Sequence, residues 1–304
     1  MNRRQFVKST SLLTGVIASG LPGISLSAPE IRNKVGGFTK LYQSLSYEET
    51  ARIASEIGWD CIECPVRPGG HVLPDRVEED LPKMVEALQK YDLTLEVMAT
   101  SIHNPGEKYT EQILKTAKSL GIKYYRMGWW NYDFSKSVES QLANFKSQLR
   151  ELTDMNRQYN IIGVYQNHSG ADSVGAPVWD IYELLKDIDS DYSGIHFDIG
   201  HATVEGGYAW PINFHLMKKY IKAVIVKDFR WHYDTDDGAE ARWCPIGQGC
   251  IDPRFFELLK EIGYTGPITM HHEYEVEGSG DEEIKNLLKA MKNDTITLRK
   301  WLNS

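Results

Sequence analysis

Helical and apolar segments alternate along most of the chain. Three helical segments, 46–58, 109–121 and 252–263, end in a glycine and lead directly into a short apolar run. Glycine at this position is typical of a helix C-terminus that closes in the left-handed conformation. Ser46 and Glu49 also form a capping-box pattern at the start of the first segment. The alternation predicts repeated units of one helix and one strand.

The apolar runs predict eight strands, and a long last helix is expected from about Asp281. Eight strand–helix units over this length are typical of a (β/α)8 barrel, so we predict a single-domain TIM barrel over residues 29–304. A doubly wound α/β sheet is the alternative, but no glycine-rich phosphate loop follows the first run. The runs are VGGFTK, DCIECPV, LTLEVMATSI, YYRMGW, IIGVYQNH, GIHFDIGH, AVIVKDF and PITMHHE.

Residues 1–28 have the pattern of a twin-arginine signal peptide. Arg3 and Arg4 lie near the start, and a modestly apolar stretch follows them. Glycines and a proline–glycine pair interrupt this stretch, so we expect no stable membrane insertion. Twin-arginine export predicts a periplasmic protein. An ordinary first helix is the alternative interpretation.

The charge of the chain restricts its partners. The formal net charge is −8 at pH 7, and residues 1–28 carry three basic and no acidic side chains, so the predicted barrel carries −11. Nucleic-acid binding requires a basic surface, so we expect no nucleic-acid partner. A homo-oligomer is compatible with the sequence.

Cys61 and Cys64 form a C-x-x-C pattern inside a predicted strand, where residues three apart point to opposite faces. A redox pair would be expected at a helix start, and a structural zinc site would need a second pair. We therefore predict two packing cysteines without a disulfide.

Polar residues gather where the predicted strands end, which is where a (β/α)8 barrel places its active site. Six of the nine histidines occur at these ends. Residues two apart on a strand share a face, so Gln166, Asp198, Lys227 and Glu273 converge if those faces point inward. Separate caps or loop hydrogen bonds are the alternative for each residue, and His196 is expected only to pack in the barrel. The other candidates are Glu63, His103, Arg126, His168, His201, Asp228 and His271.

Tryptophans follow several predicted strands. Trp129 and Trp130 follow the fourth, Trp210 the sixth, and Trp231 and Trp243 the seventh. Apolar ring faces with polar neighbours suit the C–H faces of sugars, which favours a small-molecule carbohydrate substrate. Burial as a loop anchor is the alternative for each of them.

These residues make the chain resemble the xylose-isomerase-like TIM-barrel proteins, the sugar phosphate isomerase/epimerase group that includes ketose 3-epimerases and inosose dehydratases. The resemblance covers nearly all of residues 33–304. It is strongest in IECPVRPGGHVLP, YQNHSG, HFDIGHA, VKDF, PIGQGCID and MHHEY. In this family Glu, Asp, His and Glu from strands 5 to 8 typically hold one divalent metal, often manganese, and the two glutamates act as the acid/base pair.

The resemblance implies a metal site at Gln166, Asp198 and Glu273. Gln166 stands where the family has glutamate, and Ile225 stands where it has the histidine ligand. A glutamine offers an oxygen to a hard cation but carries no charge and cannot act as a base. A divalent metal such as manganese is one expectation. The other is that Lys227 supplies the positive charge to a developing enolate oxygen.

The resulting interpretation is an exported carbohydrate isomerase- or epimerase-like enzyme that removes a proton next to a sugar carbonyl. A lyase or dehydratase acting on a keto-sugar or keto-glycoside is the alternative, because only one carboxylate of the acid/base pair remains. We assign Glu273 as the base, Lys227 as the enolate-stabilising group and His201 as the acid for the leaving oxygen. The predicted substrate-binding residues are Glu63, Arg67, His103, Arg126, Trp129, His168, His271 and Trp231.

Two other classes remain open at this point. A sugar-binding protein without turnover would explain the altered ligand set. A metal-dependent abasic-site endonuclease shares the barrel, but the negative charge, the export signal and the few metal ligands argue against it.

Overall fold

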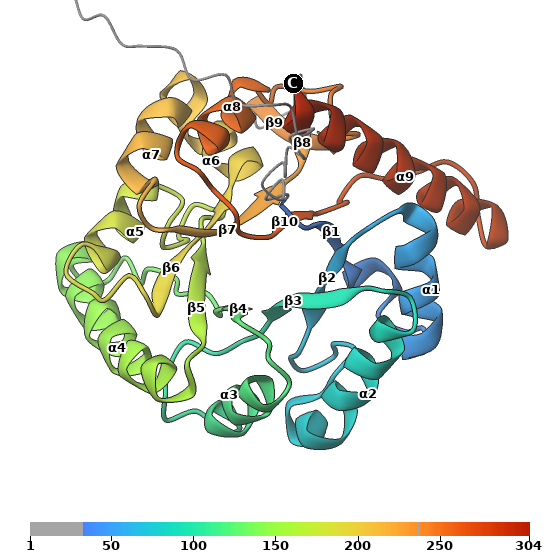
Figure 1. The fold of residues 1–304 in the computed structure, drawn as a ribbon. Helices are drawn as coiled ribbons and strands as arrows, with labels where there is room; N and C mark the ends of the chain where they lie inside the picture. The colour runs from blue at the N-terminus through green and yellow to red at the C-terminus, as the bar shows by residue number, and fades with distance from the viewer. Residues whose placement is uncertain (1–32, 236–237) are drawn as a thin grey trace, which may run out of the picture. The chain divides into compact units, whose positions relative to one another are not determined.

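Eight parallel strands close into a barrel in the order β1-β10-β7-β6-β5-β4-β3-β2 (Figure 1). The computed structural model describes residues 33–235 and 238–304, so the predicted signal peptide lies outside the described residues. Each predicted apolar run overlaps one barrel strand, which confirms the single-domain TIM barrel. The strands are β1 Val35–Phe38, β2 Cys61–Pro65, β3 Thr94–Ala99, β4 Tyr124–Arg126, β5 Ile162–Gln166, β6 Ser193–Asp198, β7 Ile221–Val226 and β10 Ile268–Met270.

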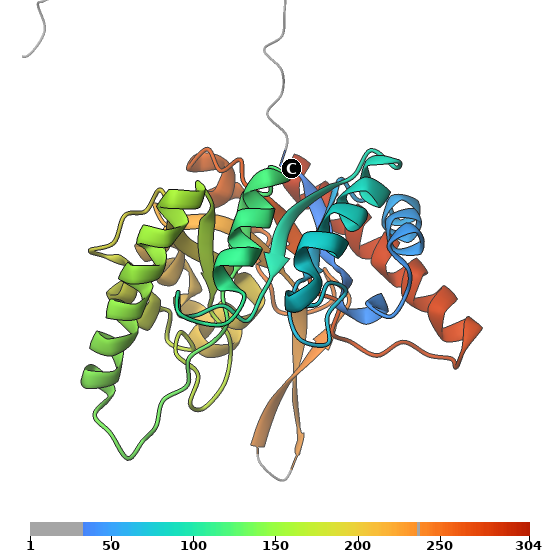
Figure 2. The same ribbon diagram turned by 90° about the horizontal axis from the view of Figure 1, so that it is seen from below.

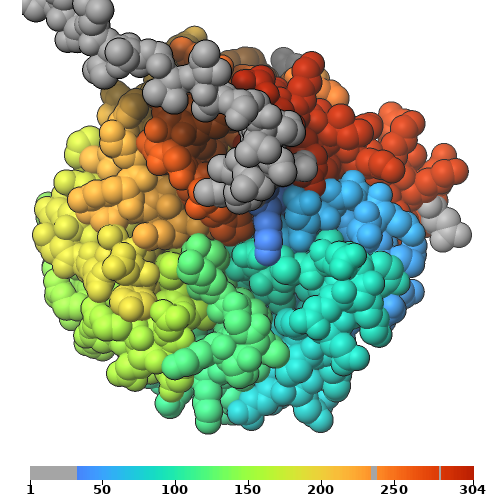
Figure 3. Space-filling model, viewed as in Figure 1, coloured from blue at the N-terminus to red at the C-terminus, as the bar shows by residue number. Residues whose placement is uncertain are grey.

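Helices form the outer layer, and the space-filling view shows the consecutive units following one another around the ring (Figure 3). Gly58, Gly121 and Gly263 follow α1, α3 and α8 with positive φ, and Ser46 and Glu49 form the predicted capping box. No helix in the described part of the chain is both long and apolar enough to cross a membrane. The helices are α1 Tyr47–Ile57, α2 Val77–Gln89, α3 Thr110–Ser119, α4 Val138–Tyr159, α5 Val178–Leu185, α6 Ile199–Gly206, α7 Trp210–Met217, α8 Arg254–Glu261 and α9 Asp281–Asn303, with 3-10 turns at Thr39–Tyr42, Pro74–Arg76 and Gly207–Ala209.

The barrel closes where the first strand meets the last. Val35 on β1 is in register with Ile268 on β10. A Cβ atom at Gly37 would lie 2.2 Å from the ring of Trp59, so only glycine lets this indole pack against β1. The Trp59 indole N–H donates to Thr295 Oγ1 at 3.1 Å, which fastens α9 across the closure.

The barrel interior changes from apolar to polar along the strands. Val97, Ile162, Val164 and Ala223 form an apolar layer contributed by β3, β5 and β7. Nearer the C-terminal ends, Glu63 on β2 contacts Arg126 on β4 and Thr269 on β10. Neither of these strands is a neighbour of β2, so the contacts cross the interior. The polar end of the barrel is therefore built into its core.

A hairpin of β8 (Asp228–Thr235) and β9 (Gly238–Cys244) extends from the barrel after β7 (Figure 2). The hydrophobic pattern did not predict it, because most of the described side chains of these strands are exposed. Asp228 anchors its base by accepting backbone N–H groups from Gly247, Gly249 and Ile251 at 2.9–3.0 Å. Asp228 is thus a structural residue of the loop.

Cys61 and Cys64 are both buried free thiols. Burial raises the pKa of the Cys64 thiol above its ordinary range, which keeps it protonated and unreactive. The prediction of two packing cysteines is confirmed.

Candidate active site

The four residues expected to converge do meet at the C-terminal ends of β5, β6, β7 and β10. The Gln166 amide nitrogen donates to Asp198 Oδ2 at 2.8 Å. Lys227 Nζ lies 3.6 Å from the same carboxylate oxygen and 2.9 Å from Glu273 Oε2. An amide, an aspartate, an ammonium and a glutamate therefore form one connected group at the barrel mouth.

Lys227 holds its charge in an unusually enclosed place. Its side chain is 2% exposed and its ammonium lies between the carboxylates of Asp198 and Glu273. The ammonium also lies 4.2 Å from the ring centre of Trp243, which comes from β9. The ring face and the two anions compensate for part of the desolvation of the buried cation. The result is a fixed positive charge next to a glutamate.

The orientation of the Gln166 amide follows from its two partners. Arg126 Nη1 donates to Gln166 Oε1 at 3.2 Å, and Gln166 Nε2 faces Asp198. A guanidinium can only donate and an ionised carboxylate can only accept, so the amide cannot be reversed. Both ends of the Gln166 amide are therefore engaged by protein groups.

A second group lies deeper in the barrel around Glu63. Its Oε2 atom accepts from Thr269 Oγ1 at 2.8 Å and contacts His271 Nε2 at 3.0 Å, while its Oε1 atom is 3.5 Å from Arg126 Nε. Burial alone would raise the pKa of Glu63, but His271, His196 and Arg126 outweigh burial and hold it well below its usual range. Glu63 is therefore a buried anion at neutral pH.

His271 connects the two groups. Its Nε2 atom contacts Glu63, and its Nδ1 atom lies 4.0 Å from Glu273 Oε1. The Phe38 ring stacks on the imidazole at a centroid distance of 4.7 Å. Burial raises the pKa of Glu273. The opposite charge of Lys227 and the neighbouring His271 lower this pKa by more than burial raises it, so the net shift is downward. Glu273, with 31% of its side chain exposed, is an ionised base with access from solvent.

His168 and His201 lie side by side beyond β5 and β6, with ring centres 4.0 Å apart. Both contact Ser169: its carbonyl oxygen is 2.8 Å from His168 Nδ1, and its backbone N–H donates to His201 Nδ1 at 3.2 Å. Burial and the nearby Lys227 lower the pKa of both imidazoles. Both rings are therefore neutral near pH 7. A neutral imidazole at position 201 is better suited to donating a hydrogen bond than to the proton transfer expected from the sequence.

The aromatic candidates have different surroundings. Trp129 lies over the Arg126 guanidinium at 4.2 Å and packs edge-on against His168 at 5.4 Å, so it borders the site. Trp231 packs on Phe229 at the base of the hairpin and lies farther out.

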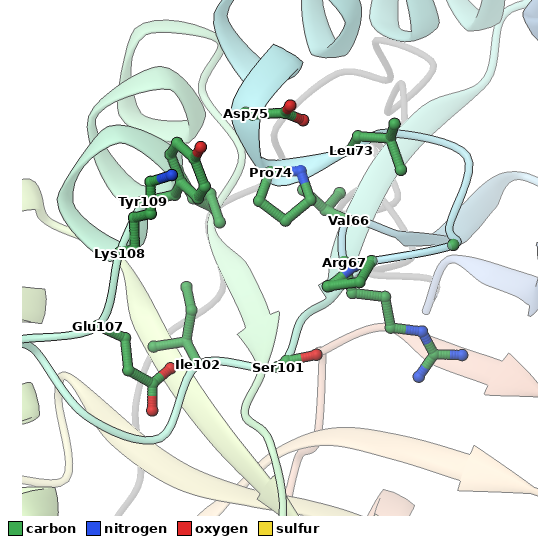
Figure 4. A pocket seen from close by; sticks show the side chains of 13 residues that line it. Val66, Arg67, Leu73, Pro74, Asp75, Ser101, Ile102, Glu107, Lys108 and Tyr109 are labelled. Carbon is green, nitrogen blue, oxygen red and sulfur yellow. The ribbon is translucent and has the colours of Figure 1, made fainter.

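The structure places His103 and Arg67 at the rim. His103 contacts Ser101 and Glu107 in the loop after β3. The Arg67 guanidinium lies 5.6 Å from the Phe38 ring centre, close to the Glu63 group. Its backbone borders a separate, mainly apolar pocket of about 430 Å³ between the loops after β2 and β3. Figure 4 shows the Arg67 side chain directed away from that pocket.

His196 is buried inside the barrel, as its expected packing role requires. Burial lowers the pKa of His196 to about 4, and neither ring nitrogen has a hydrogen-bond partner among the described residues. It fills the space between the Glu63 group and Asp198 as a neutral ring.

Sequence reasoning did not assign Ser169 or Thr269, which the structure brings into the site, and it named Trp243 only as one of the tryptophans that follow the strands. Ser169 directly follows the candidate His168, and this position was the sequence feature that could have indicated its role. Thr269 lies two positions before His271 on the same inward face of β10. Trp243 reaches Lys227 because β9 places it opposite Phe229, at the base of the hairpin, and no local pattern indicates that contact.

The residues present do not fit a divalent metal. Ile225 is buried and supplies no ligand atom, and the amide oxygen of Gln166 is already bonded to an arginine. Lys227 places an ammonium between Asp198 and Glu273, the two carboxylates that would bind the ion. In residues 33–235 and 238–304, no three His, Cys, Asp or Glu side chains are grouped to hold a metal.

The closed eight-stranded barrel places the chain in the TIM-barrel class, and the comparisons specify the family. A family model described as the xylose isomerase-like TIM barrel matches residues 51–294, so the chain belongs to this family. An uncharacterized protein of Methanocaldococcus jannaschii is 32% identical over 176 residues, which is 57% of this chain and 52% of that protein. The match thus spans about half the length of this curated relative.

Solved structures share the fold at low sequence identity. A D-psicose 3-epimerase from Clostridium cellulolyticum H10 has a TM-score of 0.65 at 13% identity, covering 88% of this chain and 99% of that one. A 3-keto-D-glucoside 4-epimerase from E. coli has a TM-score of 0.65 at 15% identity, covering 88% and 100%. A probable 3-DHS dehydratase from Bacillus anthracis has a TM-score of 0.64 at 14% identity, covering 88% and 99%. These likenesses show the fold.

Proposed function

We propose that the protein is a carbohydrate isomerase- or epimerase-like enzyme that removes a proton next to the carbonyl group of a small sugar. The observation that carries this proposal is the position of Lys227 Nζ, 2.9 Å from Glu273 Oε2. An ionised carboxylate and a fixed cation side by side are the two groups that enolate formation requires. The family and the titles of its fold relatives, which name epimerases and a dehydratase, support this reaction class.

The proposed step uses only side chains of this chain. Glu273 takes the proton from the carbon next to the carbonyl. The electron pair of that C–H bond forms the C=C bond of the enolate, and the π pair of the carbonyl moves to its oxygen. Lys227 stabilises the resulting negative charge, and His201 donates a hydrogen bond from its Nε2 atom. A hollow of about 940 Å³ lies beside the hairpin; Glu273 and Trp243 border it, whereas Lys227, Asp198 and His201 do not.

The fate of the enolate is a second question, and one observation favours elimination. Gln166 is neutral and bonded at both ends of its amide, so it cannot serve as the second base of an epimerisation. Glu273 is then the one base left of the family's carboxylate pair. We propose that elimination from a keto-sugar or keto-glycoside, or one-base isomerisation, is faster than epimerisation.

Incubation in heavy water with free sugars and 3-keto sugars tests the reaction class. We expect deuterium at the carbon next to the carbonyl, together with an isomer or an unsaturated product, and loss of both in Glu273→Gln. Binding of a sugar without deuterium incorporation would support a non-catalytic binding protein. Rapid epimerisation by Glu273→Gln would refute the assignment of the base.

A metal assay on the purified protein tests the metal-free form of the proposal. We expect turnover to persist after treatment with a chelator, with Lys227→Met losing activity that added manganese does not restore. Stoichiometric manganese, together with loss of turnover on chelation, would contradict this expectation.

We also propose periplasmic export, supported by the twin-arginine pattern of residues 1–28. Arg3→Lys with Arg4→Lys should retain the protein in the cytoplasm, as measured by cell fractionation. Unchanged export of this double variant would contradict the proposal.

A further inference from the structure

Ser169 contacts the Nδ1 atoms of two neighbouring histidines, one with a hydrogen-bond acceptor and the other with a hydrogen-bond donor. Its carbonyl oxygen lies 2.8 Å from His168 Nδ1, and a carbonyl can only accept, so this nitrogen carries a proton. Its backbone N–H points at His201 Nδ1 at 3.2 Å, and an N–H can only donate, so that nitrogen carries a lone pair. The Ser169 hydroxyl, 2.8 Å from the same His201 nitrogen, supplies a second donor.

The two hydrogen-bonding patterns leave an acceptor on the Nε2 atom of one histidine and a donor on the Nε2 atom of the other. A neutral imidazole has one N–H and one lone pair, so His168 presents a lone pair at Nε2 and His201 presents an N–H at Nε2. The His201 ring is 2% exposed, and its Nε2 atom has no hydrogen-bond partner among the described residues. Asp198 Oδ2 lies 3.8 Å from this nitrogen, beyond hydrogen-bond distance. A buried donor without a partner is costly unless a ligand satisfies it.

The pair lies where the proposed carbonyl chemistry takes place. The Trp243 ring packs edge-on against His201 at 5.1 Å and lies 4.2 Å from Lys227 Nζ. His201 Nε2 and Lys227 Nζ lie 3.8 Å and 3.6 Å from the same oxygen, Asp198 Oδ2, so an oxygen that accepts from His201 Nε2 is close to the Lys227 ammonium. His168 lies beside His201, with ring centres 4.0 Å apart, and packs edge-on against Trp129. An acceptor and a donor are thus placed next to each other at the edge of the site.

We propose that His168 and His201, held in opposite tautomers by Ser169, select substrates with a hydroxyl group on the carbon next to the carbonyl. The hydroxyl donates to His168 Nε2, and the carbonyl accepts from His201 Nε2. This inference rests on the proposed function and assigns His168 as the residue that recognises the adjacent hydroxyl. The selectivity comes from the cost of leaving a polar group unpaired when the hydroxyl is missing.

The tautomers can be read without any substrate. Nitrogen-15 NMR of the histidine side chains in the purified protein should show His168 protonated at Nδ1 and His201 protonated at Nε2. Ser169→Ala should leave both tautomers unchanged, because the peptide group that sets them remains. The same tautomer in both rings would overturn the inference.

A binding comparison tests the selectivity. The probes are methyl 3-keto-β-D-glucoside and its 2-deoxy and 4-deoxy analogues, measured by calorimetry in the Glu273→Gln background to prevent turnover. We expect one of the two deoxy analogues to bind about 10-fold more weakly, the cost of one lost hydrogen bond. His168→Asn keeps the donor to Ser169 and removes the Nε2 acceptor, so it should abolish the difference. His168→Gln, which restores an acceptor near Nε2, should recover part of it.

His201→Asn provides the matched comparison, because it should weaken the binding of all three ketones by a similar factor. If the ketones bind and His168→Asn keeps the full discrimination, this inference is wrong while the proposed function stands. If neither the ketone nor its analogues bind, both the proposed function and this inference fail.

Discussion

Glu63 and Glu273 are two glutamates at strand ends that contact opposite sides of one imidazole, His271, yet their surroundings differ. Glu63 is fully buried and lies among His271, Arg126 and Thr269. Glu273 has 31% of its side chain exposed and a close ion pair with Lys227. Both carboxylates have a lowered pKa, but only Glu273 can reach a ligand. Access to solvent therefore distinguishes a reactive carboxylate from one that holds the core together.

The largest effect is expected from Glu273→Gln. Turnover should fall roughly 10²–10⁴-fold with binding little changed, the usual range for loss of a general base. Because Glu273 is partly exposed and the amide fills the same space, the midpoint of urea unfolding should change little. Steady-state kinetics on the best substrate, with urea unfolding in parallel, measure both quantities. An unfolded variant would show that Glu273 is structural like Glu63.

Whereas Glu273→Gln should hardly change the stability, Glu63→Gln should destabilise the fold by about 3–5 kcal/mol. This is the usual cost of removing one partner of a buried ion pair. The lowered pKa of Glu63 gives stability that is complete above the ordinary glutamate pKa and is lost as pH falls through the folded-state value. The difference in unfolding free energy between the two proteins should thus be largest near neutral pH and shrink in acid. A constant difference across pH would contradict a charged Glu63.

Lys227→Met should lower turnover roughly 10²–10³-fold, as expected for loss of a group that stabilises an oxyanion. It should also move the acid limb of kcat/KM to higher pH, because burial then raises the pKa of Glu273 without the opposing charge of the ammonium. Lys227→Arg, which keeps the charge, is the control for the pH profile. An acid limb that does not move in Lys227→Met would show that Lys227 does not set the ionisation of Glu273.

The smallest effect is expected from Cys64→Ala, one position from Glu63 on β2. Removing a small buried thiol should cost on the order of 1–2 kcal/mol, less than removing the buried charge next to it. Urea unfolding of both variants gives the comparison. A native-state mass spectrum showing a Cys61–Cys64 bridge would contradict the packing role of these cysteines.

The sequence predicted the barrel because each strand–helix unit carries local signals. Strand parity also predicted that Gln166, Asp198, Lys227 and Glu273 would converge. It could not separate the roles of Asp198 and Asp228, two aspartates at neighbouring strand ends. Asp228 binds backbone N–H groups more than 18 residues later in the chain, whereas Asp198 faces Gln166 and Lys227. Such long-range pairings leave no mark in the local pattern.

The same reason explains why the hairpin was missed. β8 and β9 are largely solvated, so their periodicity carries little information about burial. Their effect on the site comes from Trp243, which contacts the Lys227 ammonium and the His201 ring. The tautomers of His168 and His201 likewise depend on the position of the Ser169 peptide, which only the folded chain defines.

The pairing of the first strand with the last has a consequence for synthesis of the protein. Val35 finds its partner, Ile268, only after nearly the whole chain has left the ribosome, and Glu273 follows that strand by a few residues. The ring and the proposed base are therefore completed in the same late step. A nascent or prematurely terminated chain that lacks β10 has neither a closed barrel nor this carboxylate, so we expect no fragment of that kind to process sugar before folding is complete.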